Sequence, residues 1–358
     1  MTGQNDAFPR RTRSTAAFER RVGAALGEHV ASGSTLLVAC SGGPDSSAAL
    51  AVVARLLQAA GGSAVAAHFD HGMRPEEETA ADLAYVEWLA SCLGVPVLAG
   101  DAGEAEAPPT SEAAARAARY RWLAGAARDV DARGCVTGHT LDDQAETVLL
   151  RLARGTGLAG AAGMDLDAPW PVACEASGGD EPLRLLRPLL GIGRVDVAVY
   201  LDGLGLAGEE RSPRHDASND DIAFSRNRIR HRVMPELEAL NHRAAEALAR
   251  FAGHARRDGE ALEAWAEREA AELVRVEGDR ARIERRALTA LPEAVALRVI
   301  RRAAAAVGLG VDGEQAAGVL AIASRRGAHL DLRGGAASTD GEAVWIVAAG
   351  GPGPRRAT

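Results

Sequence analysis

The stretch most able to perform chemistry is residues 36–47, in which an apolar run of Leu, Val and Ala is followed by a glycine-rich turn. The apolar run suits a strand that is buried on both faces, as in a parallel sheet. Gly42 and Gly43 have no side chains, so the backbone can bend there and come close to an anion. The helix-prone run after the turn leaves its first N–H groups unpaired. This string predicts a strand–turn–helix cradle for phosphate.

An ordinary strand-to-helix turn with a serine cap would explain a bare Gly-Gly. The complete string Ser-Gly-Gly-x-Asp-Ser at residues 41–46 is more selective, and it favours nucleotide binding. It differs from the Walker pattern, and the chain contains no lysine at all. Any side-chain cation that contacts phosphate must therefore be an arginine, which prefers forked, planar contacts.

Acidic residues cluster where another predicted strand ends. His139 follows the apolar residues of that strand, and Asp142, Asp143 and Glu146 lie in the first turns of the next predicted helix. Acids favour helix N-termini, which would account for one or two of the three. At the ligand-binding edge of a sheet, three carboxylates beside a histidine are candidates for binding Mg²⁺, for holding a cationic substrate, or for accepting a proton.

Arginines gather in two other segments. Arg116, Arg119 and Tyr120 are three and four residues apart and share one helix face, for which a solvated surface is the simpler explanation. Residues 211–257 hold ten Arg and six acids, although the whole chain has a net charge of −8. For this second segment, phosphate contact is as good an explanation as a solvated surface, because four arginines recur at every second residue of one short predicted helix. They are Arg226, Arg228, Arg230 and Arg232.

Alternating strand and helix patterns position these residues. Four apolar strands, each followed by a helical pattern, predict an α/β fold with a doubly wound parallel sheet. The expected strands are 36–40, 63–69, 95–99 and 134–139, and the expected helices are 16–30, 48–58, 76–93, one beginning near Thr110, and 141–153. The second strand ends in His68 and the segment up to Arg74, at the edge where such sheets bind ligands. Two histidines in a loop are nevertheless more often structural.

The C-terminal third reads differently. Residues 235–305 are helical by composition and period, with breaks near residues 277–279 and at Pro292. Beyond them we expect a helix at 312–324 and a hairpin that pairs residues 329–332 with 343–347 across a glycine-rich loop. The glycine- and proline-rich residues 165–182 are expected to form a surface loop.

Composition bounds the remaining possibilities. A chain of 358 residues predicts two or three domains, and a charge of −8 argues against non-specific coating of nucleic acid. The four cysteines are far apart and contain no C-x-x-C pair, so neither a zinc site nor a redox pair is indicated. The N-terminus lacks the apolar core of a signal peptide, and no apolar run is long enough to span a bilayer. We therefore expect a soluble cytoplasmic protein.

Taken together, five strings resemble the bacterial tRNA(Ile)-lysidine synthetases, which belong to the PP-loop ATP pyrophosphatases. The resemblance covers residues from about 20 to 240 and is specific, because G-H-x-x-D-D-Q-A-E-T occurs together with R-N-R-I-R-H. The strings are residues 41–46, 68–74, 115–123, 137–147 with 154–157, and 216–231.

The resemblance implies an adenine nucleotide alpha hydrolase-like fold and a two-step reaction. ATP and Mg²⁺ would adenylylate the wobble cytidine of a tRNA(Ile) with a CAU anticodon. Free L-lysine would then displace AMP to give lysidine. Family members are commonly monomers or dimers. The helical domain would hold the tRNA by its backbone and shape, because the reacting base must be splayed out.

The resemblance also implies roles for residues of this chain. ATP binding is assigned to Ser41, Gly42, Gly43, Pro44, Asp45, Ser46 and His68, with Asp45 facing Mg²⁺. Lysine binding is assigned to Asp142, Asp143 and Glu146, and tRNA binding to Arg116, Arg119, Arg228 and Arg230. The catalytic residues are expected to be Asp45, His139, Asp143 and Arg226, where His139 or one of the carboxylates accepts a proton.

Three other functions use similar parts. A tRNA thiolase of the same superfamily normally needs paired cysteines, and a glutamine-hydrolysing amidation enzyme needs an attached glutaminase; this sequence indicates neither. A non-catalytic, nucleotide-dependent tRNA-binding protein has little use for three carboxylates that face a polyanion. The expected domains are a disordered arm (1–15), a PP-loop catalytic domain (16–225), a helical tRNA-binding domain (226–310), a small helix with a hairpin (311–350), and a tail (351–358).

Overall fold

A parallel sheet forms the centre of the first of two compact units, residues 1–253, in the computed structural model. The structure describes residues 12–72, 75–102, 112–172, 182–206, 212–214, 222 and 224–349. Six strands lie in the order β3-β2-β1-β4-β6-β5, all parallel to their neighbours except β5, which runs antiparallel to β6. They are β1 (Thr35–Ala39), β2 (Ser63–Asp70), β3 (Val97–Asp101), β4 (Gly134–Val136), β5 (Asp167–Pro169) and β6 (Arg184–Leu186).

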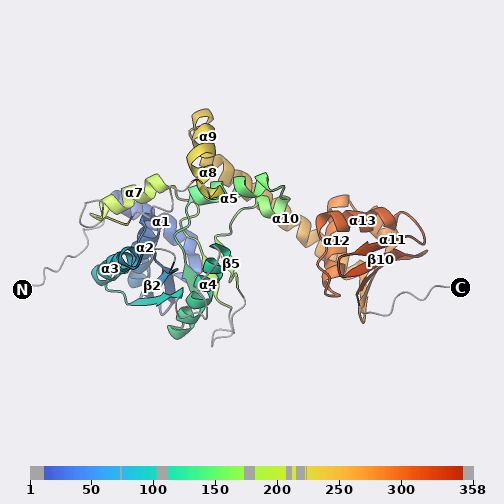
Figure 1. The fold of residues 1–358 in the computed structure, drawn as a ribbon, viewed down its shortest axis with the longest axis horizontal. Helices are drawn as coiled ribbons and strands as arrows, with labels where there is room; N and C mark the ends of the chain where they lie inside the picture. The colour runs from blue at the N-terminus through green and yellow to red at the C-terminus, as the bar shows by residue number, and fades with distance from the viewer. Residues whose placement is uncertain are drawn as a thin grey trace, which may run out of the picture. The chain divides into compact units, whose positions relative to one another are not determined.

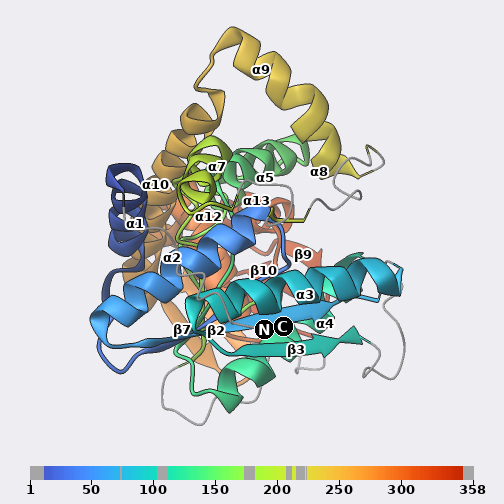
Figure 2. The ribbon, with the colours of Figure 1, turned by 90° about the vertical axis from the view of Figure 1, so that its left-hand side faces the viewer.

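Helices cover both faces of this sheet. Leu36 and Val38 of β1 pack into a core with α1, α2, α3 and α7, whereas Leu37 between them faces α4. Figure 2 shows α2 and α3 lying along β2 and β3 on one side of the sheet. The doubly wound arrangement predicted from the sequence is therefore confirmed. The helices are α1 (Arg13–Leu26), α2 (Pro44–Ala60), α3 (Glu76–Leu93), α4 (Glu112–Asp129), α5 (Leu141–Ala153), α6 (Leu158–Ala161) and α7 (Arg194–Gly203).

The strand order creates a switch point beside β1. The chain winds outward from β1 through β2 to β3 and then returns to β4 on the other side of β1. In such sheets ligands bind outside the carboxyl ends of the strands at this point. The turns that follow β1 and β4 carry the glycine-rich string and the acidic cluster, so the topology brings the two together. The helices that follow these turns, α2 and α5, are labelled in Figure 1.

A short helical segment that follows α7 in the chain packs against α5. It comprises α8 (Ser225–Arg228), one π-helical turn η4 (Ile229–Val233), α9 (Met234–Leu240) and the beginning of α10 (Ala244–Leu273). Ile229 and Met234 pack with Ala145 of α5 and with the first alanines of α10. This small apolar cluster places the arginines of α8 and η4 beside the acids of α5.

The second unit, residues 254–358, has its own core and its own antiparallel sheet, in the order β7-β8-β11-β10-β9. Ile283 and Ile346 of the sheet pack against Val295 and Val299 of α12. The elements after α10 are β7 (Val274–Glu277), β8 (Arg280–Glu284), α11 (Arg285–Ala290), α12 (Glu293–Ala305), α13 (Gly313–Ala323), β9 (His329–Leu332), β10 (Gly335–Thr339) and β11 (Ala343–Ala348). The helices expected in this region are present as α10, α12 and α13, and the region carries this sheet in addition.

Several sequence-based expectations for the second unit are wrong. Residues 274–284 form a strand hairpin around Gly278, which has a positive φ of 67°, and not a helix with a break. The expected pairing of 329–332 with 343–347 is replaced by a three-stranded meander, since β10 pairs with both β9 and β11. Because β8 pairs with β11, the chain does not divide at residue 310.

Smaller differences occur in the first unit. Residues 12–15, expected within a disordered arm, are the N-cap and the first turn of α1, where Thr12 accepts a hydrogen bond from the Thr15 N–H. The loop expected at 165–182 contains the edge strand β5. Residues 1–11 and the tail at 351–358 lie outside the described residues.

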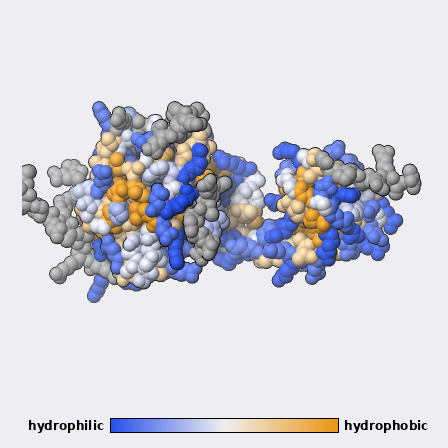
Figure 3. All heavy atoms as spheres, turned by 90° about the horizontal axis from the view of Figure 1, so that it is seen from below, coloured by the Kyte–Doolittle hydropathy of each residue, from blue (hydrophilic) through white to orange (hydrophobic). Residues whose placement is uncertain are grey.

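The surface mixes polar and apolar areas. Seen from below, hydrophilic side chains surround the apolar areas on each unit (Figure 3). None of the helices in the described part of the chain has the length and apolar character needed to cross a membrane.

Replacing Tyr200 with Ala is expected to lower the free energy of unfolding by about 3–5 kcal/mol, as for other large core aromatics. Tyr200 is 1% exposed and stacks on Phe18 at a ring-centroid distance of 4.1 Å, so truncation leaves a cavity. Val199→Ala is the matched control, because Val199 is 52% exposed on the same helix. Urea denaturation followed by circular dichroism measures both, and equal losses would contradict the placement of Tyr200 in the core.

Candidate functional site

The turn after β1 is held by its own hydroxyl groups. Ser46 Oγ accepts a hydrogen bond from the Ser41 N–H at 3.2 Å and donates one to the Gly43 carbonyl at 3.0 Å. Gly42 has a φ of 86°, a conformation that L side chains rarely adopt. Among the described residues no N-cap side chain bonds to the start of α2, and the first N–H groups of a helix have no partner within the helix. These features fit the phosphates of a nucleotide.

His68 is hydrogen-bonded to the backbone at the start of this turn. It is 4% exposed near the end of β2, and its Nδ1 lies 3.0 Å from the carbonyl oxygen of Cys40, where the turn begins. The hydrogen bond fixes the backbone at the start of the cradle. This geometry favours a supporting role for His68 over direct contact with ATP.

The turn after β4 approaches the cradle closely. A Cβ atom on Gly138 would lie 2.7 Å from the carbonyl carbon and oxygen of Asp45 and 2.8 Å from the Ser46 nitrogen. Only glycine permits this approach without a shift of backbone. The first turns of α2 and α5 therefore lie side by side, with their acidic residues in one place.

Asp143 uses its two oxygens differently. Oδ2 accepts hydrogen bonds from the Thr140 N–H at 2.8 Å and from the Thr140 hydroxyl at 3.0 Å, which forms a capping box at the start of α5. Oδ1 faces away from the cap. Helix capping therefore explains Oδ2 of Asp143. Oδ1 of Asp143 takes no part in the cap and faces the site.

Three guanidinium groups converge on Asp143 and Glu146. Asp143 Oδ1 lies 2.6 Å from Arg194 Nη2 and 3.1 Å from Arg226 Nη2. Glu146, whose side chain is 1% exposed, accepts Arg194 Nη1 at 3.0 Å and Arg230 Nε at 2.8 Å on Oε1. Its Oε2 accepts Arg226 Nε at 2.8 Å. Arg226 and Arg230, expected to face phosphate, are thus bonded to carboxylates in the free protein.

These ion pairs keep both carboxylates charged. Burial by itself would raise the pKa of Asp143, but Arg194 and Arg226 outweigh it and the pKa is lowered. Burial likewise opposes ionisation of Glu146, and the hydrogen bond from Arg230 and the charge of Arg194 lower its pKa. The pKa of Arg194 is raised, because its acidic neighbours outweigh its burial.

His139 is held neutral beside this cluster. Its Nδ1 lies 2.8 Å from the Thr137 hydroxyl. Burial lowers the pKa of His139 to about 3; the charge of Asp143 opposes this shift and that of Arg187 adds to it. A histidine with so low a pKa is a weak proton acceptor at neutral pH.

Asp45 lies between the cradle and the acids of α5. Its Oδ2 is 3.6 Å from Arg194 Nε, while Asp142 Oδ2 accepts the Arg194 backbone N–H at 2.8 Å. Burial, followed by the charge of Asp143, raises the pKa of Asp45 to about 6, although Arg194 opposes the shift. A carboxylate that lacks sufficient positive charge around it attracts a cation.

The donor set at Asp45 fits Mg²⁺ only as part of a nucleotide complex. In the described part of the chain no group of three or more His, Cys, Asp or Glu side chains could hold a metal. Mg²⁺ in nucleotide sites is commonly held by one or two carboxylates together with substrate phosphates. Asp45, at the start of α2, is placed to supply one such carboxylate.

A second basic group surrounds Tyr120 of α4. Arg116 Nη2 donates to the Tyr120 hydroxyl at 2.9 Å, and the Arg119 guanidinium lies 5.4 Å from the ring centroid. Arg187, which the sequence did not single out, is 8% exposed and donates to the carbonyl oxygen of Asp165 at 2.7 Å. Its position directly after β6 was the available signal, because the carboxyl ends of parallel strands share one edge.

The remaining predicted residues lie apart from the carboxylates or outside the description. Arg228 is exposed on α8 and donates to Ser225 Oγ at 3.1 Å. Residues 73–74, 216–221 and 223 belong to two of the predicted strings and lie outside the described residues.

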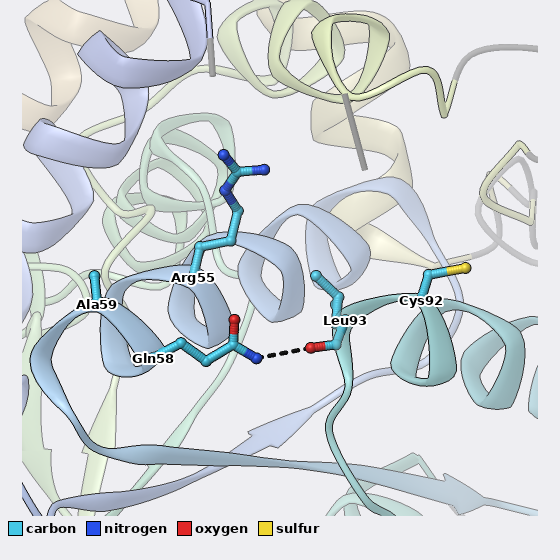
Figure 4. Close-up of a pocket in the computed structure, with 5 residues that line it drawn as sticks. All are labelled: Arg55, Gln58, Ala59, Cys92 and Leu93. Atoms are coloured by element: carbon cyan, nitrogen blue, oxygen red, sulfur yellow. Dashed lines mark hydrogen bonds between the residues drawn. The ribbon is translucent and has the colours of Figure 1, made fainter. Parts of the chain in front are cut away.

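A surface hollow elsewhere carries no such chemistry. It lies between the C-terminal ends of α2 and α3, where Gln58 Nε2 donates to the Leu93 carbonyl at 2.7 Å (Figure 4). Asp45 is at the opposite end of α2. The hollow is therefore separate from the site.

The protein-family model described as a PP-loop domain matches residues 14–237. The chain is 39% identical over 290 residues to the tRNA(Ile)-lysidine synthase of Gloeobacter violaceus, covering 81% of this chain and 82% of that protein. It is 40% identical over 318 residues to that of Thermobifida fusca, covering 84% and 88%. The match to that of Dehalococcoides mccartyi is 36% identical over 277 residues and covers 76% of this chain and 56% of the relative.

Among solved structures, a U34-tRNA thiolase from Methanococcus maripaludis has a similar fold. The TM-score is 0.53 at 14% identity, over 67% of this chain and 78% of the thiolase. At this identity the likeness concerns the fold alone.

Replacing Asp45 with Asn is expected to stabilise the protein at pH 8 by about 1–3 kcal/mol, the equivalent of a pKa shift of about two units. The raised pKa means that the folded state binds a proton more tightly than the unfolded state, so the charged carboxylate destabilises the fold above about pH 6. The gain should decline as the pH falls from 6 towards 4, where native Asp45 is protonated. Melting temperatures of both proteins across this range measure it, and a gain that does not depend on pH would contradict the raised pKa.

Proposed function

The chain belongs to the tRNA(Ile)-lysidine synthase family, and on that premise we propose that its site joins lysine to the wobble cytidine of a tRNA(Ile) with a CAU anticodon. The observation that carries the proposal is the shared edge of the sheet. The phosphate cradle at the start of α2 and the acids of α5 lie side by side, because Gly138 approaches Asp45 so closely. A nucleotide and a cationic amine can therefore meet at one place.

The first step activates the cytidine. The oxygen of its ring carbonyl attacks the α-phosphorus of ATP, the bond to the β-phosphate breaks, and pyrophosphate leaves. The N–H groups and hydroxyls of residues 41–46 hold the departing pyrophosphate in this proposal. Mg²⁺, when bound with ATP at Asp45, would offset the negative charge of the phosphates. The step converts a poor leaving oxygen into a good one.

The second step transfers lysine. Its amine attacks the activated ring carbon, the carbon–oxygen bond to AMP breaks, and one proton leaves the nitrogen. Asp142, Asp143 and Glu146 would bind the ammonium groups of lysine. The pKa values of His139, Asp143 and Glu146 are all lowered, and that of His139 is about 3, so none of the three is a strong base. We therefore assign proton acceptance to Asp45, whose pKa is raised to about 6.

The arginines outside the carboxylate cluster are the candidates for tRNA contact. Arg228 is exposed on α8, and Arg116 is exposed on α4. Arg119 lies near Arg116, against the ring of Tyr120. Guanidinium groups bind phosphate in a forked geometry, which suits the backbone of an anticodon loop.

The purified protein, given ATP, Mg²⁺ and labelled lysine, is expected to attach lysine to an isoleucine tRNA transcript with a CAU anticodon and to release AMP. Asp143→Asn should mainly impair the use of lysine, because it removes one charge from the amine-binding group. Asp45→Asn should abolish AMP release. Product analysis by mass spectrometry measures the outcome.

A methionine tRNA transcript with the same CAU anticodon is the matched control and is expected to remain unmodified. Consumption of ATP with a sulfur donor, and no incorporation of lysine, would instead indicate a thiolase and would overturn the proposal.

Binding of tRNA is expected to weaken steeply with salt, and Arg228→Ala should reduce the slope of log K against log salt concentration by about one. The reason is that an exposed arginine which contacts phosphate releases about one counterion. Arg133→Ala is the control, since this exposed residue precedes β4 at the opposite edge of the sheet. Filter binding over a range of salt measures both slopes, and an unchanged slope for Arg228→Ala would make this arginine part of a solvated face.

A further inference from the structure

The backbone of Arg194 is held in place independently of the contacts that its side chain makes. Arg194 is the first residue of α7, after the N-cap Gly193, and its backbone N–H donates to Asp142 Oδ2 at 2.8 Å. The helix behind it is anchored by Val197 and Tyr200, both about 1% exposed, in the main core. The origin of the side chain is therefore rigid.

The guanidinium of Arg194 reaches carboxylates of two different helices. Nη2 lies 2.6 Å from Asp143 Oδ1 and Nη1 lies 3.0 Å from Glu146 Oε1, both on α5. Nε lies 3.6 Å from Asp45 Oδ2 on α2. In the ion pairs found among the described residues, Arg194 alone joins the two helices.

We propose that Arg194 is a positioning residue for the transfer of lysine: it orients Asp143 and Glu146 towards the amine and fixes their place relative to Asp45. This inference rests on the proposed function. A planar guanidinium with donors in a fixed fork holds two carboxylates at a set separation, which a single ammonium charge does not do. The catalytic constellation then depends on one side chain that touches neither substrate.

The simplest other role for Arg194 is to neutralise the buried Glu146. The structure argues against this role, because Arg226 and Arg230 also bind Glu146, at 2.8 Å each. Glu146 would still have two cationic partners after the loss of Arg194. Asp45, in contrast, would lose its sole ion-pair partner among the described residues. The expected consequence is a loss of orientation, with the charge of Glu146 still compensated.

The two other arginines are less suited to fix the carboxylates. They lie on α8, which has four residues, and on a single π-helical turn. This segment is joined to α5 through a small apolar cluster, while α7 packs in the main core. Arg194 is thus the partner whose position depends least on that segment.

The test compares Arg194→Ala and Arg194→Lys with the wild-type chain in the lysine-ligation assay. Arg194→Ala is expected to raise the KM for lysine by about tenfold or more, a size seen when supporting residues of a site are removed. Pyrophosphate release with tRNA and ATP but no lysine, which reports the first step alone, should fall by less than about threefold. Arg194→Lys, which keeps the charge without the fork, should give an intermediate KM.

Arg21→Ala is the matched control. Arg21 of α1 forms an ion pair of 2.6 Å with Asp196, which lies on α7 as Arg194 does. This pair is half-exposed and lies outside the site. The control should leave both steps unchanged.

Each outcome decides one question. An equal loss in both steps for Arg194→Ala, with an unchanged KM for lysine, would show a merely structural role and overturn the inference. If that variant does not fold, Arg194→Lys decides: a wild-type KM means that the fork is not needed and contradicts the inference, and a raised KM supports it. Failure of the wild-type chain to attach lysine would instead overturn the proposed function.

Discussion

The contact on which the site depends is the close approach of two backbones, at Gly138 and Asp45. A side chain at position 138 would meet the peptide group of Asp45 at 2.7 Å, so the two turns could not occupy their present places. Because the turns follow adjacent strands, β1 and β4, the sheet fixes their spacing and the missing side chain lets them close the remaining distance. The phosphate cradle and the acidic cluster become one site through this contact, and Arg194 of α7 adds to it by pairing with acids of both helices.

Ion pairs with the acids of α5 then hold α7, α8 and η4 around these two turns. Burying Glu146 is costly unless its charge is compensated, and three arginines from α7, α8 and η4 supply the compensation. The same carboxylates therefore hold the helical segment of residues 225–240 against the sheet domain. This arrangement ties a segment rich in exposed arginine to the place where a nucleotide would react. The carboxylates that stabilise this part of the fold are in this way the same groups that we propose for the reaction.

The sequence could predict what depends on local pattern. Helix α5 has the bounds that were expected, 141–153, because its cap and its apolar spacing are both local. Arg194 was missed as a site residue, since its contact with Glu146 joins positions 48 residues apart. Strand β10 was also missed: Gly and Ala, which make up its first three residues, are depleted in strands, and residues 335–339 form a strand because they pair with neighbours on both sides. Hydrogen-bonded pairing and ion pairing over long distances leave little trace in composition.

The charge balance of the cluster explains why its pKa shifts differ in sign. Within the described residues, four carboxylates face three guanidinium groups, so one negative charge is in excess. The excess is not shared evenly: the arginines hold Asp143 and Glu146 ionised, whereas burial, and after it the negative charge of Asp143, raises the pKa of Asp45. A site arranged in this way is incomplete until a cation arrives. Two of the proposed ligands are cations, the amine of lysine and a Mg²⁺ that would accompany ATP, and either would offset the negative charge at Asp45.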